Sequence, residues 1–450
     1  MTSGLLSRYF GFEEPVNRRM YLRAGLLLMI LKYVVDAGAI WLVTHQTWTP
    51  VDYLFPLLTW RAPKVEAFPV WLSTALILWT LPFTWMGVSL TLRRAIDAGK
   101  SPWYCLLFFL PGLNYLVMLW LATLPSSNTE WRRSPIVVSA AGRLRSALLG
   151  IAASALIGVI TVAFATLFMR SYGLSLFVAT PFVLGAVTAF IHNRDHPRSA
   201  RETEGVVVLS VALVGGTLIL FALEGLACII MAAPLGIVAA VLGGMVGRLV
   251  AIQTRVPPAS TAYLFLLLPA ASIADRASPA PPVYEAVTSI VVAAPADSVW
   301  EHVIRFSDIT AEPSLPFRLG IAYPVRAVIT GAGVGAVRHC EFSTGAFVEP
   351  ITVWDAPHRL SFGVTAQPPA LRELSPYAQV YAPHVKGFFK AQRGEFRLVS
   401  LPDGRTRLEG STWYTLQLYP QGYWRPIAEW LLTRIHTRVL EQVRKEAEHR

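Results

Sequence analysis

The strongest constraint on the fold of this chain is a series of long apolar segments in its first 275 residues. A helix needs about 20 mostly apolar residues to cross the hydrocarbon core of a bilayer, where the backbone finds no hydrogen-bond partner outside the helix. Because the chain has 54% hydrophobic and only 15% charged residues, a wholly soluble protein is excluded. The sequence therefore predicts a polytopic α-helical membrane domain. Seven segments reach or approach the spanning length: residues 24–43, 68–90, 104–124, 147–168, 173–191, 206–222 and 226–250.

An eighth apolar segment, residues 262–274, is short for a spanning helix. Its 13 residues include Pro269. At about 1.5 Å per residue such a helix covers roughly 20 Å of a core that is about 30 Å thick. We interpret it as a helix that lies in the membrane interface.

The Lys and Arg residues between these segments predict the topology, because cytoplasmic loops are enriched in them. If all eight segments cross with the N-terminus inside, the inner loops hold eight basic residues and the outer loops ten, which breaks the rule. If residues 104–124 instead enter the bilayer and return, broken at Pro111 and Gly112, fifteen lie inside and three outside. We favour this re-entrant topology. The C-terminal part of the chain is then cytoplasmic if the eighth segment does not cross, as we expect, and exported if it does.

The formal net charge of +11 does not indicate nucleic-acid binding. Residues 1–275 carry +8 and the remaining 175 residues only +3, so most of the excess lies between apolar segments. A nucleic-acid interface requires clustered Lys and Arg on a folded soluble surface. We expect the lipid bilayer as a partner and no nucleic acid.

The composition changes abruptly after Asp275. Residues 276–283 form a Pro-rich linker, and from Tyr284 the apolar residues alternate with a period of two, as in the strands of a soluble α+β domain. A closing helix over residues 423–448 has apolar residues at every fourth position. The predicted strands cover residues 286–292, 323–329, 334–342, 347–354, 360–365, 395–401 and 405–418.

Several motifs of this domain resemble the START-like SRPBCC superfamily, which includes polyketide cyclases and lipid carriers. They are Val291-Val-Ala-Ala-Pro-Ala-Asp-Ser-Val-Trp-Glu-His-Val303, Gly333-Val-Gly335 followed by Arg338, and Glu349-Pro-Ile-Thr-Val-Trp-Asp355. The resemblance implies a START-like helix-grip domain, an antiparallel sheet around a long C-terminal helix, over residues 284–450. Members of the superfamily bind sterols, lipids, polyketides and hormones, or act as non-catalytic sensors, so function does not follow from the fold.

A second motif, Arg93-Arg-Ala-Ile-Asp-Ala-Gly-Lys-Ser-Pro-Trp-Tyr104, resembles the YhaH-like inner-membrane family, a domain of unknown function. Ile96 stands where that family usually has a histidine. The resemblance implies a membrane module over residues 1–125, followed by further transmembrane helices over residues 126–275, and nothing enzymatic.

In a helix-grip domain the side chains between the sheet and the helix line a cavity or fill a core, and strand alternation shows which residues face inward. Both interpretations remain open, because the two kinds of site have the same composition. The candidates for a ligand cavity are Cys340, Phe342, Trp354, Phe362, Phe396, Leu398, Leu408, Thr412, Tyr414 and Leu416.

No catalytic or metal motif is evident. His339 could act as an acid or base, but its neighbour Arg338 must point to the opposite face, and a surface cross-strand pair explains this region better. Cys105, Cys228 and Cys340 lie in different modules, so no disulfide or zinc site is expected. The cluster His192, Asp195 and His196 lacks a firm third ligand, and we predict no metal and no cofactor.

Three charged residues in or beside the apolar segments are candidates for a functional role. Lys32 and Asp36 are four residues apart on one helix face, so we expect a structural ion pair. Glu224 lies where one segment ends, and a carboxylate close to the membrane core is either functional or an interfacial turn residue.

These observations predict a multi-pass protein of a bacterial inner membrane whose tethered domain, expected in the cytoplasm, binds a hydrophobic small molecule such as a lipid or polyketide without catalysis. One alternative is a cyclase-like or dehydratase-like enzyme that uses His339 or Tyr414 as proton carrier. The other is a membrane scaffold or stress sensor that docks a protein partner.

Overall fold

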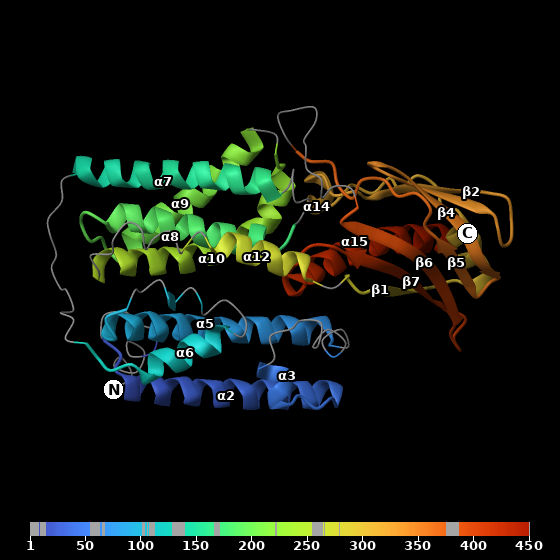
Figure 1. Ribbon diagram of the computed structural model, residues 1–450. Helices are drawn as coiled ribbons and strands as arrows, with labels where there is room; N and C mark the ends of the chain where they lie inside the picture. Colours follow the sequence, from blue (N-terminus) through green and yellow to red (C-terminus); the bar gives the residue numbers. More distant parts are fainter. Residues whose placement is uncertain are drawn as a thin grey trace. The chain divides into compact units, whose positions relative to one another are not determined.

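The fold was analysed in a computed structural model, in which the chain forms two compact units, Met1–Phe221 with Met231–Pro279 and Ala222–Ile230 with Ala280–Arg450 (Figure 1). We call them the membrane unit and the sheet unit. The structure describes residues 15–54, 68–100, 113–127, 140–165, 172–220, 223–253, 266–278, 280–374 and 387–449, with positions 9, 64, 104, 105, 107 and 264.

The membrane unit begins with α2 (Arg18–Thr44), α3 (Pro50–Leu54), α5 (Val70–Asp97) and α6 (Leu113–Thr123). The side chain of Asn17 caps α2 by accepting the Met20 N–H at 2.9 Å. Among the described residues, five helices are long and apolar enough to cross a membrane: Arg18–Thr44, Leu144–Ala163, Ser175–Asn193, Ala200–Leu220 and Leu226–Ile252. The prediction of a polytopic helical domain is confirmed.

The segment that contains α6 returns to the end of the bundle from which it starts. The Ser127 N–H donates to the Asp97 carbonyl oxygen at 2.6 Å, and the Ser126 hydroxyl donates to the Asp97 carboxylate at 2.7 Å. The Arg94 Nε also donates to the Leu121 carbonyl oxygen at 2.9 Å. Residues 97 and 127 therefore lie side by side, which fits the re-entrant topology expected for residues 104–124.

The membrane unit continues with α7 (Ala140–Ala163), η3 (Ser175–Ala179), α8 (Thr180–Asn193), α9 (Ala200–Leu220), α10 (Leu226–Gln253) and α12 (Leu267–Arg276). Helices α8 and α10 approach through glycines. A Cβ on Gly185 would lie 1.9 Å from the Ala240 carbonyl oxygen, and one on Gly243 would lie 1.9 Å from that of Phe182. Small residues at such crossings let two backbones pack closely in a membrane, where apolar burial gives no driving force between helices.

Helix α12 ends where η3 and α8 begin. The Asp275 carboxylate accepts the backbone N–H groups of Leu174 and Ser175 at 2.7 and 3.0 Å, and the Ser175 hydroxyl at 2.5 Å. Helix α10 finishes at the other end of the bundle, where Arg248 binds the Arg198 carbonyl oxygen at 2.7 Å. Arg248 near the end of α10 and Asp275 near the end of α12 therefore lie at opposite ends of the bundle. The expected interfacial segment, residues 262–274, lies partly outside the described residues.

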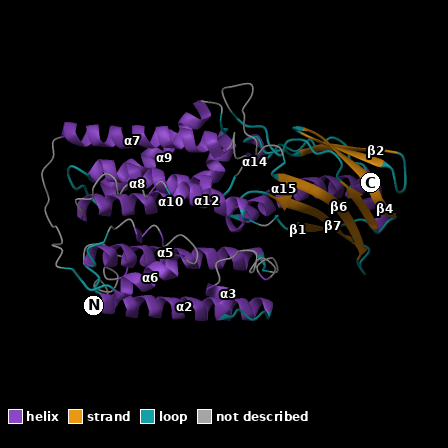
Figure 2. Ribbon diagram, viewed as in Figure 1, coloured by secondary structure: helices purple, strands orange, loops and turns teal. Residues whose placement is uncertain are grey.

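The sheet unit contains seven antiparallel strands in the order β1-β7-β6-β5-β4-β3-β2. The first and last strands pair with each other, and the sheet and the C-terminal helix α15 (Gln421–Glu448) enclose one core (Figure 2). This arrangement confirms the predicted helix-grip fold. The other elements are β1 (Tyr284–Val292), α13 (Ala296–Ile304), α14 (Leu315–Arg318), β2 (Pro324–Thr330), β3 (Val337–Phe342), β4 (Gly345–Asp355), β5 (Arg359–Gly363), β6 (Phe389–Ser400) and β7 (Thr406–Leu416).

The main departure from the predicted strands is β6, which begins at Phe389 rather than at residue 395. Its first four residues, Phe-Lys-Ala-Gln, alternate between apolar and polar, but Arg393 and Gly394 break the alternation before the rest of the strand. Pairing with β7 holds them extended, with Phe389 opposite Leu416 and a register shift between Ala391 and Arg393. A bulge of this kind moves the side chains out of the period-two pattern, which hides the strand in the sequence.

Candidate functional site

A buried ion pair lies on the inner face of the sheet. Arg338 on β3 and Glu349 on β4 are direct cross-strand partners, and the guanidinium donates to the carboxylate. Arg338 is only 2% exposed, and its guanidinium carbon lies 5.7, 5.2 and 5.5 Å from the ring centroids of Phe306, Phe362 and Phe396. Burial raises the pKa of Glu349, and the neighbouring Arg338 opposes that shift. The pair thus places one polar contact within an aromatic core.

Most of the predicted cavity residues lie in the same core. Cys340, Phe362, Phe396, Leu398 and Leu408 are buried together with the C-terminal half of α15, and Phe342 and Trp354 pack against them. Burial raises the pKa of the Cys340 thiol to about 12, so this thiol stays protonated at neutral pH and is no nucleophile. This half of the inner face is a packed core.

Thr412 lies in a different environment. Its hydroxyl bonds to the His436 Nε2 at 2.8 Å, while the His436 Nδ1 bonds to the Thr288 hydroxyl at 3.1 Å. Burial lowers the pKa of His436 to about 4, so the ring is neutral at pH 7. This histidine bridges β1 and β7 to α15 and has a structural role.

The remaining two candidates, Tyr414 and Leu416, are buried where β7 ends. The Tyr414 ring stacks on Phe389 at 5.3 Å between centroids and lies 5.8 Å from that of Tyr284. Arg425 on α15 lies over the Tyr284 ring at 4.4 Å and pairs with Glu429. Aromatic surface and polar groups therefore meet at this end of the sheet.

The Tyr414 hydroxyl is the unusual atom of this group. Tyr414 is 0% exposed, and within the described residues its hydroxyl forms no hydrogen bond of ordinary geometry, although the Glu429 carboxylate lies near it. Burial, and then the charge of Glu429, raise the pKa of Tyr414, so the phenol is protonated and able to donate. A buried hydroxyl without a partner costs about 1–3 kcal/mol.

His339 does not share this face. It is half-buried on the side of β3 opposite Arg338 and Cys340, with Val328 and Val348 as its cross-strand partners. The expected surface cross-strand pair forms instead between Arg326 and Glu341, at 2.8 Å. Of the two proton carriers considered for an enzyme, only Tyr414 points inward. The sequence prediction also missed Arg338 as an inward residue, although it lies two positions from Cys340.

The polar residues of the apolar segments are placed as follows. Lys32 and Asp36 form the expected ion pair on α2, with 2.5 Å between Nζ and Oδ2. The histidine and aspartate of the metal-like cluster separate, because His192 bonds to Ser146 and Asp195 lies beside Arg194. Glu224 is buried just before α10.

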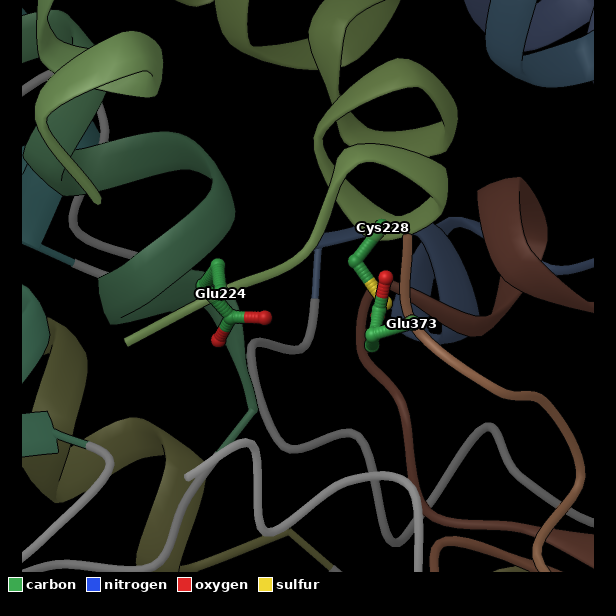
Figure 3. A group of neighbouring side chains, drawn as sticks. All are labelled: Glu224, Cys228 and Glu373. Carbon is green, nitrogen blue, oxygen red and sulfur yellow. The ribbon is translucent and has the colours of Figure 1, made fainter. Parts of the chain in front are cut away.

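Glu224, Cys228 and Glu373 come together within the sheet unit, which includes residues 222–230 (Figure 3). Their potential ligand atoms lie within 4.8 Å of one another, and the Leu226 N–H donates to the Leu374 carbonyl oxygen at 3.1 Å. A Cβ on residue 225 would lie 1.9 Å from the Glu373 carboxylate, so Gly225 is required for this approach. Two carboxylates and a thiol are donor types that Zn²⁺ accepts. No periodic pattern or motif singles out Glu373, which follows β5 in an irregular segment.

The Arg93-Arg94 motif has a structural explanation. Arg94 is fully buried, and its guanidinium donates to the Leu121 and Leu124 carbonyl oxygens and pairs with Asp97. It therefore binds the end of α6 to the end of α5. The motif holds the re-entrant segment in place.

The chain is thus a multi-helix membrane protein with a helix-grip domain. Residues 9–132 match the family model described as "Protein of unknown function (DUF805)", over the region of the expected YhaH-like module. A search of curated proteins found no match.

Several solved structures are similar to about two fifths of the chain. A protein from Nitrosospira multiformis has 20% identity and a TM-score of 0.23, covering 37% of this chain and 97% of its own. An aromatase/cyclase from Streptomyces sp. R1128 has 19% identity and a TM-score of 0.24, covering 38% and 96%. Norcoclaurine synthase from Thalictrum flavum has 15% identity and a TM-score of 0.25, covering 38% and 98%. The fold of the sheet unit is defined here by its own strand order and register.

Proposed function

We propose that the helix-grip domain binds a hydrophobic ligand with a polar group, a lipid or polyketide-like molecule, and performs no covalent chemistry on it. The observation that carries this proposal is the buried Tyr414 hydroxyl, which forms no hydrogen bond of ordinary geometry within the described residues and has only the nearby Glu429 carboxylate as a weak partner. A ligand atom that accepts its proton would offset the cost of burying that group. Tyr284 and Phe389 supply the apolar surface beside it.

The lack of chemistry is supported by the state of the candidate reactive groups. The Cys340 thiol is protonated, and His436 is held neutral between two threonine hydroxyls. Tyr414, with its raised pKa, is a hydrogen-bond donor rather than a base. These groups suit recognition better than proton transfer.

The test uses the full-length protein purified in a mild detergent. Organic extraction and mass spectrometry should recover an apolar compound from the wild type, and about five- to tenfold less from Tyr414→Phe, since one hydrogen bond contributes about 1 kcal/mol. The matched control is Tyr284→Phe, because the Tyr284 hydroxyl already donates to Gln421. A wild-type protein that carries no apolar compound and takes up no apolar fluorescent probe would refute the proposal. Recovery of a chemically altered probe would favour the enzyme alternative.

We further propose that the protein resides in a bacterial inner membrane with the helix-grip domain on the exported side. The basic loops, including the one with Arg194 and Arg198, lie where α8 and α10 finish, and the cytoplasm favours such loops. Asp275 lies at the other end of the bundle. The expectation of a cytoplasmic domain required that the eighth apolar segment not cross, and the positions of Arg248 and Asp275 at opposite ends of the bundle favour crossing.

A further inference from the structure

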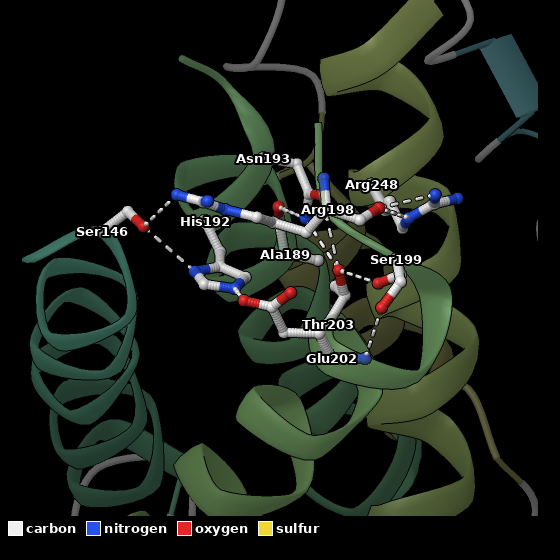
Figure 4. Close-up of polar contacts among 9 residues, drawn as sticks. All are labelled: Ser146, Ala189, His192, Asn193, Arg198, Ser199, Glu202, Thr203 and Arg248. Atoms are coloured by element: carbon white, nitrogen blue, oxygen red, sulfur yellow. Dashed lines mark hydrogen bonds and ion pairs between the residues drawn. The ribbon is translucent and has the colours of Figure 1, made fainter. Parts of the chain in front are cut away.

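One end of the membrane unit holds a cluster of buried polar side chains (Figure 4). It is formed where α7 and α9 begin and where α8 and α10 finish. The Ser146 hydroxyl lies between two groups, the His192 Nδ1 at 3.1 Å and the Arg198 Nη2 at 3.4 Å. The other ring nitrogen of His192 lies 3.7 Å from the Glu202 carboxylate. This cluster is separate from the helix-grip site.

Arg198 is the member without a counter-ion. It is 6% exposed, and in the described part of the chain it forms no ion pair. Its Nε has no hydrogen-bond partner there, and its only side-chain hydrogen bond goes to Ser146. A buried guanidinium without an anion is costly, because the charge loses its hydration without compensation.

The position of Arg198 is nevertheless fixed. Its backbone N–H donates to the Asn193 side chain at 2.8 Å, and its carbonyl oxygen accepts from Arg248 Nε and Nη2 at 2.9 and 2.7 Å. The Asn193 amide is itself held by the Ala189 carbonyl oxygen at 2.8 Å. The two sides of the residue are thus anchored to α8 and α10, and the guanidinium is held at the start of α9.

The nearby carboxylates are directed elsewhere. Glu202 faces His192, and the exposed Asp195 lies 3.9 Å from Arg194. Arg248 adds a second positive charge on the other side of Arg198. The local field therefore favours an anion beside the Arg198 and Ser146 side chains.

We propose that this site binds the phosphate group of an anionic phospholipid, with the Arg198 guanidinium and the Ser146 hydroxyl as its ligands. Arginine presents several donors in a fixed plane that matches the oxygens of a phosphate. The site lies at the ends of spanning helices, which is the depth of the headgroups. Next to Ser146 the surface of α7 is apolar and exposed, at Leu144, Leu148 and Leu149, and offers contact for acyl chains. A free phosphate ion would bind the Arg198 donors but would make no use of the exposed leucines.

The experiment measures the melting temperature of the full-length protein in a neutral detergent, after addition of phosphatidylglycerol, phosphatidylcholine or inorganic phosphate. A ligand that binds only the folded state raises the melting temperature in proportion to its affinity. We expect a selective rise with phosphatidylglycerol. No selectivity over phosphatidylcholine would overturn the proposal, and an equal response to inorganic phosphate would overturn the lipid as occupant.

The variant Arg198→Gln separates a ligand site from a structural contact. We expect its apparent affinity for phosphatidylglycerol to fall about ten- to hundredfold, the usual contribution of hydrogen bonds to a charged group. Its melting temperature without anionic lipid should stay the same or rise, because an unpaired buried charge has been removed. Arg194→Gln, which removes the same charge from an exposed position in the same loop, should change the affinity less than twofold.

Two further variants cover the case in which Arg198→Gln fails to fold. Arg198→Lys keeps the charge but not the planar donors, and Ser146→Ala removes the second ligand, so each should weaken phosphatidylglycerol binding several-fold. Unchanged binding in both would contradict the site. If the melting temperature of Arg198→Gln lies below that of the wild type by the same amount with and without phosphatidylglycerol, the role of Arg198 is purely structural.

Discussion

Arg338 and Glu349 face each other across β3 and β4, and the Arg338 guanidinium lies over three phenylalanine rings. Removal of one partner leaves the other charge buried and unpaired, which typically costs 3–5 kcal/mol. We therefore expect Arg338→Met to lower the free energy of unfolding by about that amount, as measured by denaturation of the full-length protein in detergent. Arg326→Met breaks an exposed pair with Glu341 and should cost less than about 1 kcal/mol.

The double variant Arg338→Met with Glu349→Leu should recover most of the loss. Apolar side chains of similar volume can replace a buried ion pair at little cost. If Arg338→Met lowers the free energy of unfolding by no more than Arg326→Met does, then burial does not make the Arg338–Glu349 pair more important for stability than an exposed pair.

The lowered pKa of His436 predicts that the protein loses stability in acid. Its folded-state pKa of about 4 lies below the ordinary value of 6.5, so the unfolded chain takes up the proton first as the pH falls. Stability from this residue is complete above about pH 7 and decreases between about pH 6.5 and 4, by at most about 3 kcal/mol. Thermal melting against pH should show this slope in the wild type and a weaker one in His436→Gln. His449→Gln, at an exposed position, should leave the slope unchanged.

The crossing of α8 and α10 predicts a strong effect of a single methyl group. A Cβ on Gly185 would lie 1.9 Å from a backbone oxygen of Ala240, which cannot turn away as a side chain could. We expect Gly185→Ala to lower stability by about 2 kcal/mol or more, since overpacking forces the helices apart. Gly216→Ala on α9 has no heavy atom within 4 Å of the new Cβ and should be neutral or stabilising. Equal melting temperatures for the two variants would contradict the close crossing.

The proposed orientation predicts which positions a membrane-impermeant thiol reagent reaches in intact cells. In a chain whose three native cysteines are replaced by alanine, Ser278→Cys should be labelled and Ser199→Cys should not. Labelling after cell lysis controls for reactivity. The reverse pattern would place the helix-grip domain in the cytoplasm.

The sequence could predict those parts of the fold that follow from periodicity or charge. Apolar residues at every fourth position fixed the C-terminal helix to within two residues of α15. The balance of basic residues indicated the re-entrant segment, and the structure explains its stability through Arg94, whose bonds to the Leu121 and Leu124 carbonyl oxygens could not be read from spacing.

The inner face of the sheet was predicted only in part. Arg338 was not among the predicted inward residues, although strand alternation puts it on the same face as Cys340. Its partner Glu349 becomes visible only once the β3–β4 register is known. The meeting of Glu373 with Glu224 and Cys228 depends on an irregular segment and has no periodic signal.

The bonds from Asp275 to the start of η3 fix the point at which the chain leaves the bundle. Only eight residues, 276–283, separate Asp275 from β1. Such a tether reaches roughly 20 Å, so the domain stays within a volume where its effective concentration relative to the bilayer surface is on the order of millimolar. Under the proposed function, a ligand taken from the membrane would meet the domain in a step that is effectively intramolecular, so its rate per molecule would not depend on how much of the protein the cell makes.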